Sequence, residues 1–249
     1  MKNTPKCAFA NLNRMLILLD DIGDKLTYCR KKIRIQGFER NTIMPVANNA
    51  EEYIAQQKIA IASNPDCGTS RYNLAVALLG QKKYDDAEQE LQEAIRCSPT
   101  LAEAYVQLGG ISLQRGNIDE CLELNKQATR ARAGFSEGWG NIGFIHLQKG
   151  ELDDAIRALE KAIAYNSRYL QAYTNLANAY LMNGMVDKSI ETSLKVIELE
   201  PSFAVAHNNL AIAYLEKGKP DLAKKYCDQA VQLGYDVAPE ILKEFEQQE

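Results

Sequence analysis

Histidine is scarce in this sequence, and the residue patterns that usually carry chemistry are missing. His146 and His207 are the only two histidines. There is no glycine-rich Walker loop for phosphate, no Gly-x-Ser-x-Gly nucleophile elbow and no His-Glu-x-x-His pair. Because no cysteine or histidine spacing suits zinc either, we expect no catalytic residues, no metal and no cofactor. The acidic pairs at 85–86 and 153–154 are expected to start helices rather than to share a proton.

Long apolar runs are also absent, and the six cysteines form no Cys-x-x-Cys pair. No stretch approaches the roughly 18 apolar residues of a membrane span, so none is predicted. The composition, 46% hydrophobic and 25% charged, is ordinary for a soluble protein. We interpret the cysteines as reduced residues that mostly serve packing, which favours a cytoplasmic location.

The charge is unevenly distributed along the chain. Residues 1–48 carry nine Lys or Arg against four acidic residues, whereas the remainder carries 20 against 29. A net charge of +5 therefore precedes one of -9. Such asymmetry is typical of a basic arm that docks on an acidic partner, or on the acidic part of its own chain.

A period of 34 residues dominates the sequence from residue 68 onward, with five blocks beginning at 68, 102, 136, 170 and 204. Position seven of each block is large and apolar, and positions eight and twenty-seven are nearly always small, which allows two helices to approach closely. Glycine recurs where a first helix is expected to end, followed by Asp or Glu in the turn. The small residues at position eight are Ala75, Gly109, Gly143, Ala177 and Ala211; the glycines are Gly116, Gly150, Gly184 and Gly218.

This pattern resembles the tetratricopeptide repeat, whose signature is an aromatic, Leu-Gly, Tyr, then spaced Ala, aromatic, Ala and Pro. The third block matches it through Trp139, Gly143, Ala155 and Ala162, with Ile142, His146 and Leu159 as variants. The resemblance implies an all-α, right-handed α-solenoid of helix-turn-helix repeats. The predicted organisation is an N-terminal helical, basic segment (1–48), a degenerate partial repeat (49–67), five repeats (68–101, 102–135, 136–169, 170–203 and 204–237) and a C-terminal capping helix (238–249).

One polar residue recurs at position six, as Asn73, Gln107, Asn141, Asn175 and Asn209. In the family, the first helix of each repeat lines the concave surface through this position among others. The resemblance therefore implies a file of carboxamides, each with two donors and one acceptor for a peptide backbone. A similar ladder binds peptide backbones in the repeat domain of O-linked N-acetylglucosamine transferases, whose catalytic domain has no room here. At position nine, Phe144 and Asn178 complete the predicted peptide-binding set. The alternative is that these residues reflect the family consensus and meet only solvent.

The first 48 residues match no family that we recognise. Leu12, Met15, Leu19, Ile22, Leu26, Cys29 and Ile33 form a heptad seam. The seam favours a helix packed on the first repeat, with self-association through a coiled coil as the rival. A basic cluster at residues 30–34 suits anionic lipid, nucleic acid or an acidic protein. Nucleic acid is disfavoured because the repeats are acidic and offer no stacking platform.

Together these patterns predict a non-catalytic scaffold or adaptor that binds an extended segment of a partner protein. Two alternatives remain open: a homo-oligomeric scaffold that assembles through its N-terminal helix, and a regulatory subunit of a separately encoded enzyme. Repeat scaffolds share one fold across unrelated tasks, so the partner itself is not encoded in a recognisable motif.

Overall fold

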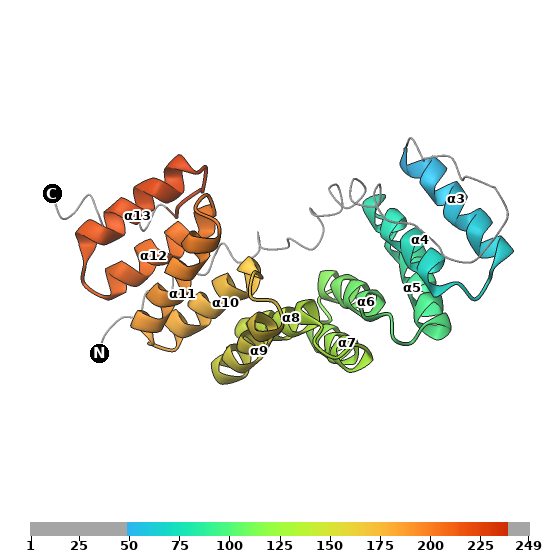
Figure 1. The fold of residues 1–249 in the computed structure, drawn as a ribbon, viewed down its shortest axis with the longest axis horizontal. Helices are drawn as coiled ribbons and strands as arrows, with labels where there is room; N and C mark the ends of the chain where they lie inside the picture. The colour runs from blue at the N-terminus through green and yellow to red at the C-terminus, as the bar shows by residue number, and fades with distance from the viewer. Residues whose placement is uncertain (1–48, 239–249) are drawn as a thin grey trace. The chain divides into compact units, whose positions relative to one another are not determined.

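The computed structural model describes residues 49–238, and these residues contain α-helices and turns without any strand (Figure 1). The predictions for residues 1–48 and 239–249 lie outside the described residues. The helices are α3 (Ala50–Ser63), α4 (Gly68–Gly80), α5 (Tyr84–Cys97), α6 (Ala102–Gln114), α7 (Ile118–Ala131), α8 (Ser136–Gln148), α9 (Leu152–Tyr165), α10 (Leu170–Met182), α11 (Val186–Leu199), α12 (Ala204–Glu216) and α13 (Pro220–Gln232).

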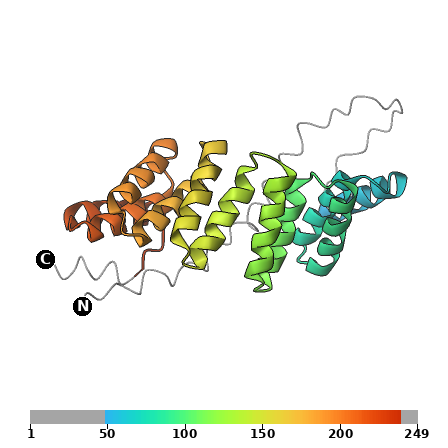
Figure 2. The same cartoon turned by 90° about the horizontal axis from the view of Figure 1, so that it is seen from below.

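The described residues form two compact units that divide between Arg132 and Ala133. In the N-terminal unit, α4 pairs with α5 and α6 with α7, while α3 packs on α4 and α5 on α6. In the C-terminal unit, α8 pairs with α9, α10 with α11 and α12 with α13, and α9–α10 and α11–α12 contacts join these pairs. Figure 2 shows the same pairs turned by 90°. The all-α helical-repeat fold that the sequence predicts is thus confirmed.

The first and second helices of a pair differ in how many of their faces are buried. The second helix α9 buries one stripe, Ala155, Leu159 and Ala162, at 0% exposure, and its remaining faces are largely polar. The first helix α10 lies between neighbours and buries residues on several faces, including Ala172, Leu176, Ala177, Ala179 and Tyr180. This explains why second helices have a clear amphipathic pattern and first helices do not.

Glycine or alanine at position eight lets the two helices of a pair come into contact. A Cβ atom added to Gly143 would lie 2.5 Å from Cγ of Leu159, the fully buried residue of the facing helix. At Gly109 an added Cβ would lie 2.8 Å from Nδ2 of Asn125. The small residues of the repeat are therefore required by backbone proximity.

The second residue after each first helix has a left-handed backbone. Gly116, Gly150, Gly184 and Gly218 have φ between 70° and 82°. In the first complete pair this place is taken by Lys82 at φ 59°, the one non-glycine residue with positive φ in the described part of the chain. The Lys83 N–H still donates to the Leu78 carbonyl at 3.0 Å, so the turn keeps its hydrogen bonding at the expense of backbone strain.

Candidate peptide-binding face

The position-six carboxamides lie on the first helix of each pair. In the C-terminal unit, α10 contacts both α8 and α12. Asn141, Asn175 and Asn209 therefore come from three successive neighbouring helices. Asn73 on α4 and Gln107 on α6 belong to the N-terminal unit. We call the surface formed by α8, α10 and α12 the carboxamide face.

The five position-six residues differ in exposure, although the sequence treats them alike. Asn175 and Asn209 are only 4% and 5% exposed, whereas Asn73, Gln107 and Asn141 are half-buried. The Oδ1 atom of Asn175 accepts a hydrogen bond from Nε2 of Gln171 at 3.3 Å. Asn175 is therefore partly satisfied within its own helix.

Two adjacent carboxamides on α12 carry buried atoms with no hydrogen-bond partner. These atoms are Oδ1 of Asn208 and Nδ2 of Asn209, in residues that are 7% and 5% exposed. A buried amide atom without a partner costs about 1–3 kcal/mol, so such atoms are rare unless something else binds them. The oxygen would accept from an N–H group, and the amide nitrogen would donate to a carbonyl.

Asn208 was not among the predicted site residues. Its signal in the sequence is the Asn-Asn doublet at positions five and six of the fifth block, which no other block contains. Phe144 on α8 and Asn178 on α10, both predicted, are half-buried at position nine of their helices. They therefore lie one helical turn beyond Gly140 and Thr174, in the same part of the carboxamide face.

In the N-terminal unit, Gln107 has a partner within the protein. Burial and the nearby charge of Glu103 raise the pKa of Tyr72 to about 12, while a hydrogen bond with the Gln107 side chain works in the opposite direction. The Gln107 side chain thus lies beside the Tyr72 hydroxyl. Asn209 differs, because its Nδ2 atom is buried without a hydrogen-bond partner.

His207 has contacts at both of its ring nitrogens. His207 is 6% exposed, with Nε2 2.9 Å from the Pro201 carbonyl and Nδ1 3.2 Å from Oε1 of Gln229. Its ring centroid lies 6.1 Å from that of Tyr226. Both ring nitrogens are therefore used in packing α12 against its surroundings.

His146, Glu151 and Asp154 bring three possible metal-ligand atoms within 4.8 Å of one another. Nδ1 of His146 lies 2.5 Å from Oε2 of Glu151. The carboxylates already have cationic partners, because Arg157 contacts Asp154 at 2.5 Å and Lys149 contacts Glu151 at 3.7 Å. The cluster also surrounds the positive N-terminal end of α9, which opposes a bound cation.

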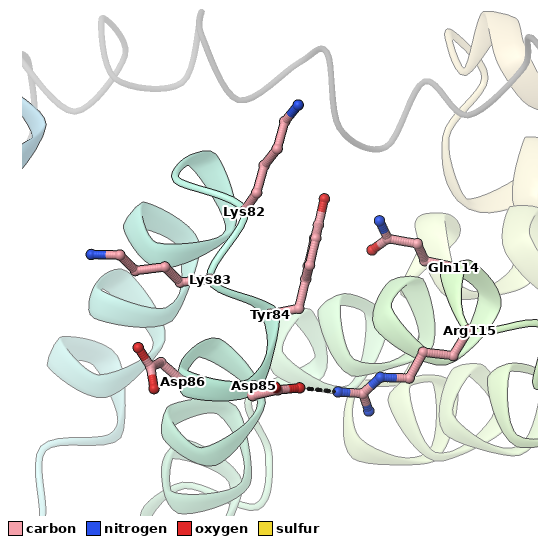
Figure 3. A pocket seen from close by; sticks show the side chains of 7 residues that line it. All are labelled: Lys82, Lys83, Tyr84, Asp85, Asp86, Gln114 and Arg115. Carbon is pink, nitrogen blue, oxygen red and sulfur yellow. Dashed lines mark hydrogen bonds and ion pairs between the residues drawn. The ribbon is translucent and has the colours of Figure 1, made fainter.

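An open cleft of about 460 Å³ lies beside the α4–α5 turn of the N-terminal unit. Arg115 borders one side and donates to Asp85 at 2.7 Å (Figure 3). It also donates to Glu88 at 2.7 Å. Side chains of both charge signs line the cleft. Its lining residues are Lys82, Lys83, Tyr84, Asp85, Asp86, Gln114 and Arg115.

The described helices include none with the length and apolar character needed to cross a membrane. Stacked antiparallel helix pairs with small residues at their contacts and left-handed turns define a class of protein, the α-helical repeat proteins. Four models of the tetratricopeptide repeat match residues 54–102, 143–184, 170–203 and 204–233. The chain belongs to the tetratricopeptide-repeat family.

Several solved structures share this fold. A crystal structure of the MamA protein is 26% identical over 70% of this chain and 98% of its own, with a TM-score of 0.59. YrrB, described as "a TPR protein with an unusual peptide-binding site", is 20% identical over 71% of this chain and 91% of its own, with a TM-score of 0.59. A chain of the Cut9-Hcn1 hetero-tetramer is 21% identical over 80% of this chain and 40% of its own, with a TM-score of 0.68. No curated protein matches the sequence.

Proposed function

We propose that this protein is a non-catalytic adaptor that binds an extended segment of a partner protein on its carboxamide face. The observation that carries the proposal is the pair of unpartnered amide atoms, Oδ1 of Asn208 and Nδ2 of Asn209, buried on α12. They provide one acceptor and one donor, which is the complement of a peptide unit. Asn141 and Asn175 extend the same chemistry to α8 and α10.

The spacing of the helices fits this ligand. Packed helices lie about 8–10 Å apart, and an extended chain advances about 3.3–3.6 Å per residue. One carboxamide would therefore meet the bound backbone about every third residue. Backbone hydrogen bonds favour many sequences equally, so side-chain selectivity would come from neighbours such as Phe144.

The family assignment supports protein binding in general. Among the proteins with this fold, YrrB is described as having a peptide-binding site, which illustrates what the fold permits. The geometry of His207, with both ring nitrogens engaged in packing, supports the non-catalytic part of the proposal.

The proposal is tested by selecting displayed random peptides on the immobilised full-length protein and then measuring synthetic binders by isothermal titration calorimetry. Wild type is compared with Asn208→Ala and Asn209→Ala. Each substitution removes one hydrogen bond of about 0.5–1.5 kcal/mol, so the Kd should rise about two- to tenfold. Chemical denaturation should show little change in stability, because the lost packing is offset by removal of an atom that is buried without a partner, Oδ1 of Asn208 or Nδ2 of Asn209.

Asn64→Ala is the matched control, because Asn64 is exposed and lies after α3 in the other unit. It should leave the Kd unchanged. Equal binding by wild type, Asn208→Ala and Asn209→Ala would overturn the proposal. A fall in stability that parallels the loss of binding would assign these amides a structural role instead.

A further inference from the structure

Two of the four cysteines in the described residues directly precede residues that touch each other in the fold, although 30 positions separate them in the sequence. Cys67 is the residue before α4, and Cys97 is the last residue of α5. Both are partly exposed, whereas Cys121 and Cys227 are buried. Of the cysteines that the structure describes, these two are therefore the ones open to small reagents.

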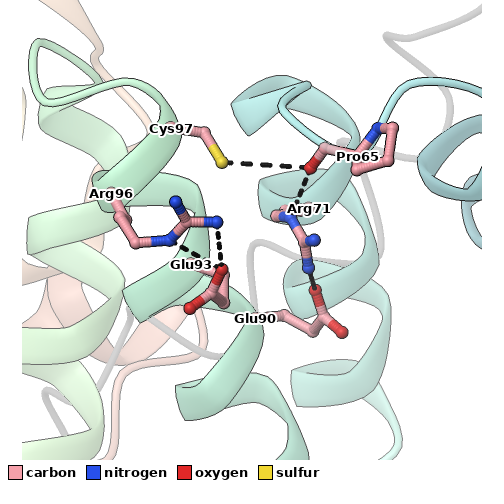
Figure 4. Close-up of polar contacts among 6 residues, drawn as sticks. All are labelled: Pro65, Arg71, Glu90, Glu93, Arg96 and Cys97. Atoms are coloured by element: carbon pink, nitrogen blue, oxygen red, sulfur yellow. Dashed lines mark hydrogen bonds and ion pairs between the residues drawn. The ribbon is translucent and has the colours of Figure 1, made fainter.

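The contact between Gly68 and Ser98 brings the two cysteines together. A Cβ atom added to Gly68 would lie 2.7 Å from Cβ of Ser98, so the two backbones touch at this point. Cys67 and Cys97 each precede one of these contacting residues. The Sγ atom of Cys97 also lies 3.9 Å from the carbonyl oxygen of Pro65, two residues before Cys67 (Figure 4).

The surroundings of Cys67 favour its thiolate form. The Ser70 hydroxyl donates to Sγ of Cys67 at 3.2 Å. This hydrogen bond lowers the pKa of the Cys67 thiol. Partial burial raises the pKa, and the backbone N–H groups of Ser70 and Thr69 lower it further. Burial instead raises the pKa of Cys121 to about 11. The thiolate is the nucleophilic form of cysteine, so the two sites should differ strongly in reactivity.

Two arginines lie near the second sulfur. Arg71 donates to the Pro65 carbonyl at 3.1 Å, the same oxygen that Cys97 contacts. Figure 4 shows Arg96 beside Cys97, with its guanidinium paired to Glu93. The Pro65 carbonyl thus connects the segment before Cys67 to both Arg71 and Cys97.

We propose that Cys67 and Cys97 form a peroxide-sensitive thiol pair that is reversibly converted to an intramolecular disulfide. The Cys67 thiolate attacks a hydroperoxide, forming an S–O bond as the O–O bond breaks, with water (from hydrogen peroxide) leaving after protonation. The Cys97 sulfur then attacks the sulfenic acid of Cys67, forming the S–S bond and expelling a second water. Two thiols are oxidised by two electrons, and the hydroperoxide is reduced by two. In the second step the Cys67 side chain turns from Ser70 toward Cys97, because a disulfide requires Cβ atoms about 3.5–4.5 Å apart.

The test treats the reduced full-length protein with hydrogen peroxide, blocks the remaining thiols by alkylation, and maps every cysteine by peptide mass spectrometry. The expected product is a peptide pair linked through Cys67 and Cys97, which dithiothreitol reverses, while Cys121 and Cys227 stay reduced. In Cys97→Ser, the sulfenic acid on Cys67 should persist and be trapped by dimedone. Non-reducing electrophoresis should show monomer.

Ser70→Ala separates activation of the thiol from mere proximity. Without the hydroxyl, the thiol pKa rises and the reaction at neutral pH slows by about threefold per pKa unit, because a tenfold loss of thiolate is partly offset by higher intrinsic nucleophilicity. Ser63→Ala, which removes an exposed hydroxyl on α3 that donates to the Ile59 carbonyl, is the matched control and should react as wild type does. A disulfide between two chains, a Cys67 link to Cys7 or Cys29, or the absence of a linked product from the folded protein would overturn the proposal.

Discussion

Replacing Lys82 with glycine should stabilise the protein, because Lys82 has φ 59° at a turn where the other complete helix pairs have glycine. A non-glycine residue in the left-handed region costs about 1–2 kcal/mol. Part of this stabilisation is lost, because the greater freedom of glycine in the unfolded chain costs roughly 0.5–1 kcal/mol. The net gain should be roughly 0.5–1 kcal/mol in free energy of unfolding. The turn's backbone bond from Lys83 to Leu78 does not use the Lys82 side chain and should persist.

Urea denaturation of the full-length protein, followed by circular dichroism, measures this change. The midpoint should rise without a change in the denaturant slope, because the folded and unfolded surfaces are nearly the same. Gln81→Gly is the matched control: Gln81 lies in the same turn with φ -90°, so glycine gains nothing there and should lower stability. Gly116→Lys is the reciprocal change and should destabilise, since Gly116 has φ 82°. An unchanged or lower midpoint for Lys82→Gly, or an equal gain for Gln81→Gly, would refute the reasoning.

Three further outcomes follow from packing and ionisation. Gly143→Ala should lower the free energy of unfolding by about 1–3 kcal/mol, because the new Cβ would lie 2.5 Å from Leu159. Gly110→Ala should raise it by up to about 1 kcal/mol, because a Cβ there would meet no atom within 4 Å. The same urea assay measures both changes. Ser193→Ala should stabilise by about 1 kcal/mol, since the Ser193 hydroxyl is buried without a partner; a loss of stability would reveal a hydrogen bond. Burial raises the pKa of Tyr169 to about 12, above the unfolded value near 10, so its contribution to stability is complete below pH 10 and is lost as the pH rises toward 12. Tyr169→Phe should therefore lose less stability over this range, and an identical pH profile would contradict the assignment.

The helical repeat was predictable because its determinants are local and recur. Small residues such as Gly143 and turn glycines such as Gly150 appear once per period, and each has a single structural role. The same pattern located the position-six carboxamides on first helices. The repeating helix pairs thus follow from spacing and side-chain size, and the family follows from the resemblance that these residues carry.

The exposure of each carboxamide was not predictable. Asn73 and Asn209 occupy equivalent positions in the sequence, yet one is half-buried and the other is 5% exposed. Burial depends on the side chains of adjoining helices, which differ from one pair to the next. In the sequence, Asn208 stands out only as part of the Asn-Asn doublet with Asn209. That doublet does not reveal whether the Asn208 oxygen has a hydrogen-bond partner, and the structure shows that it has none.

The sequence by itself determined the period, the all-α fold and the positions at which two helices must approach closely, because these depend on residue size and backbone freedom within one repeat. Only the tertiary structure decided which side chains meet across repeats. It brought Gly68 and Ser98, the residues after Cys67 and Cys97, into contact, and it left two amide atoms of α12 buried without partners. Such contacts arise from the packing of whole helices, and no local pattern of residues specifies them.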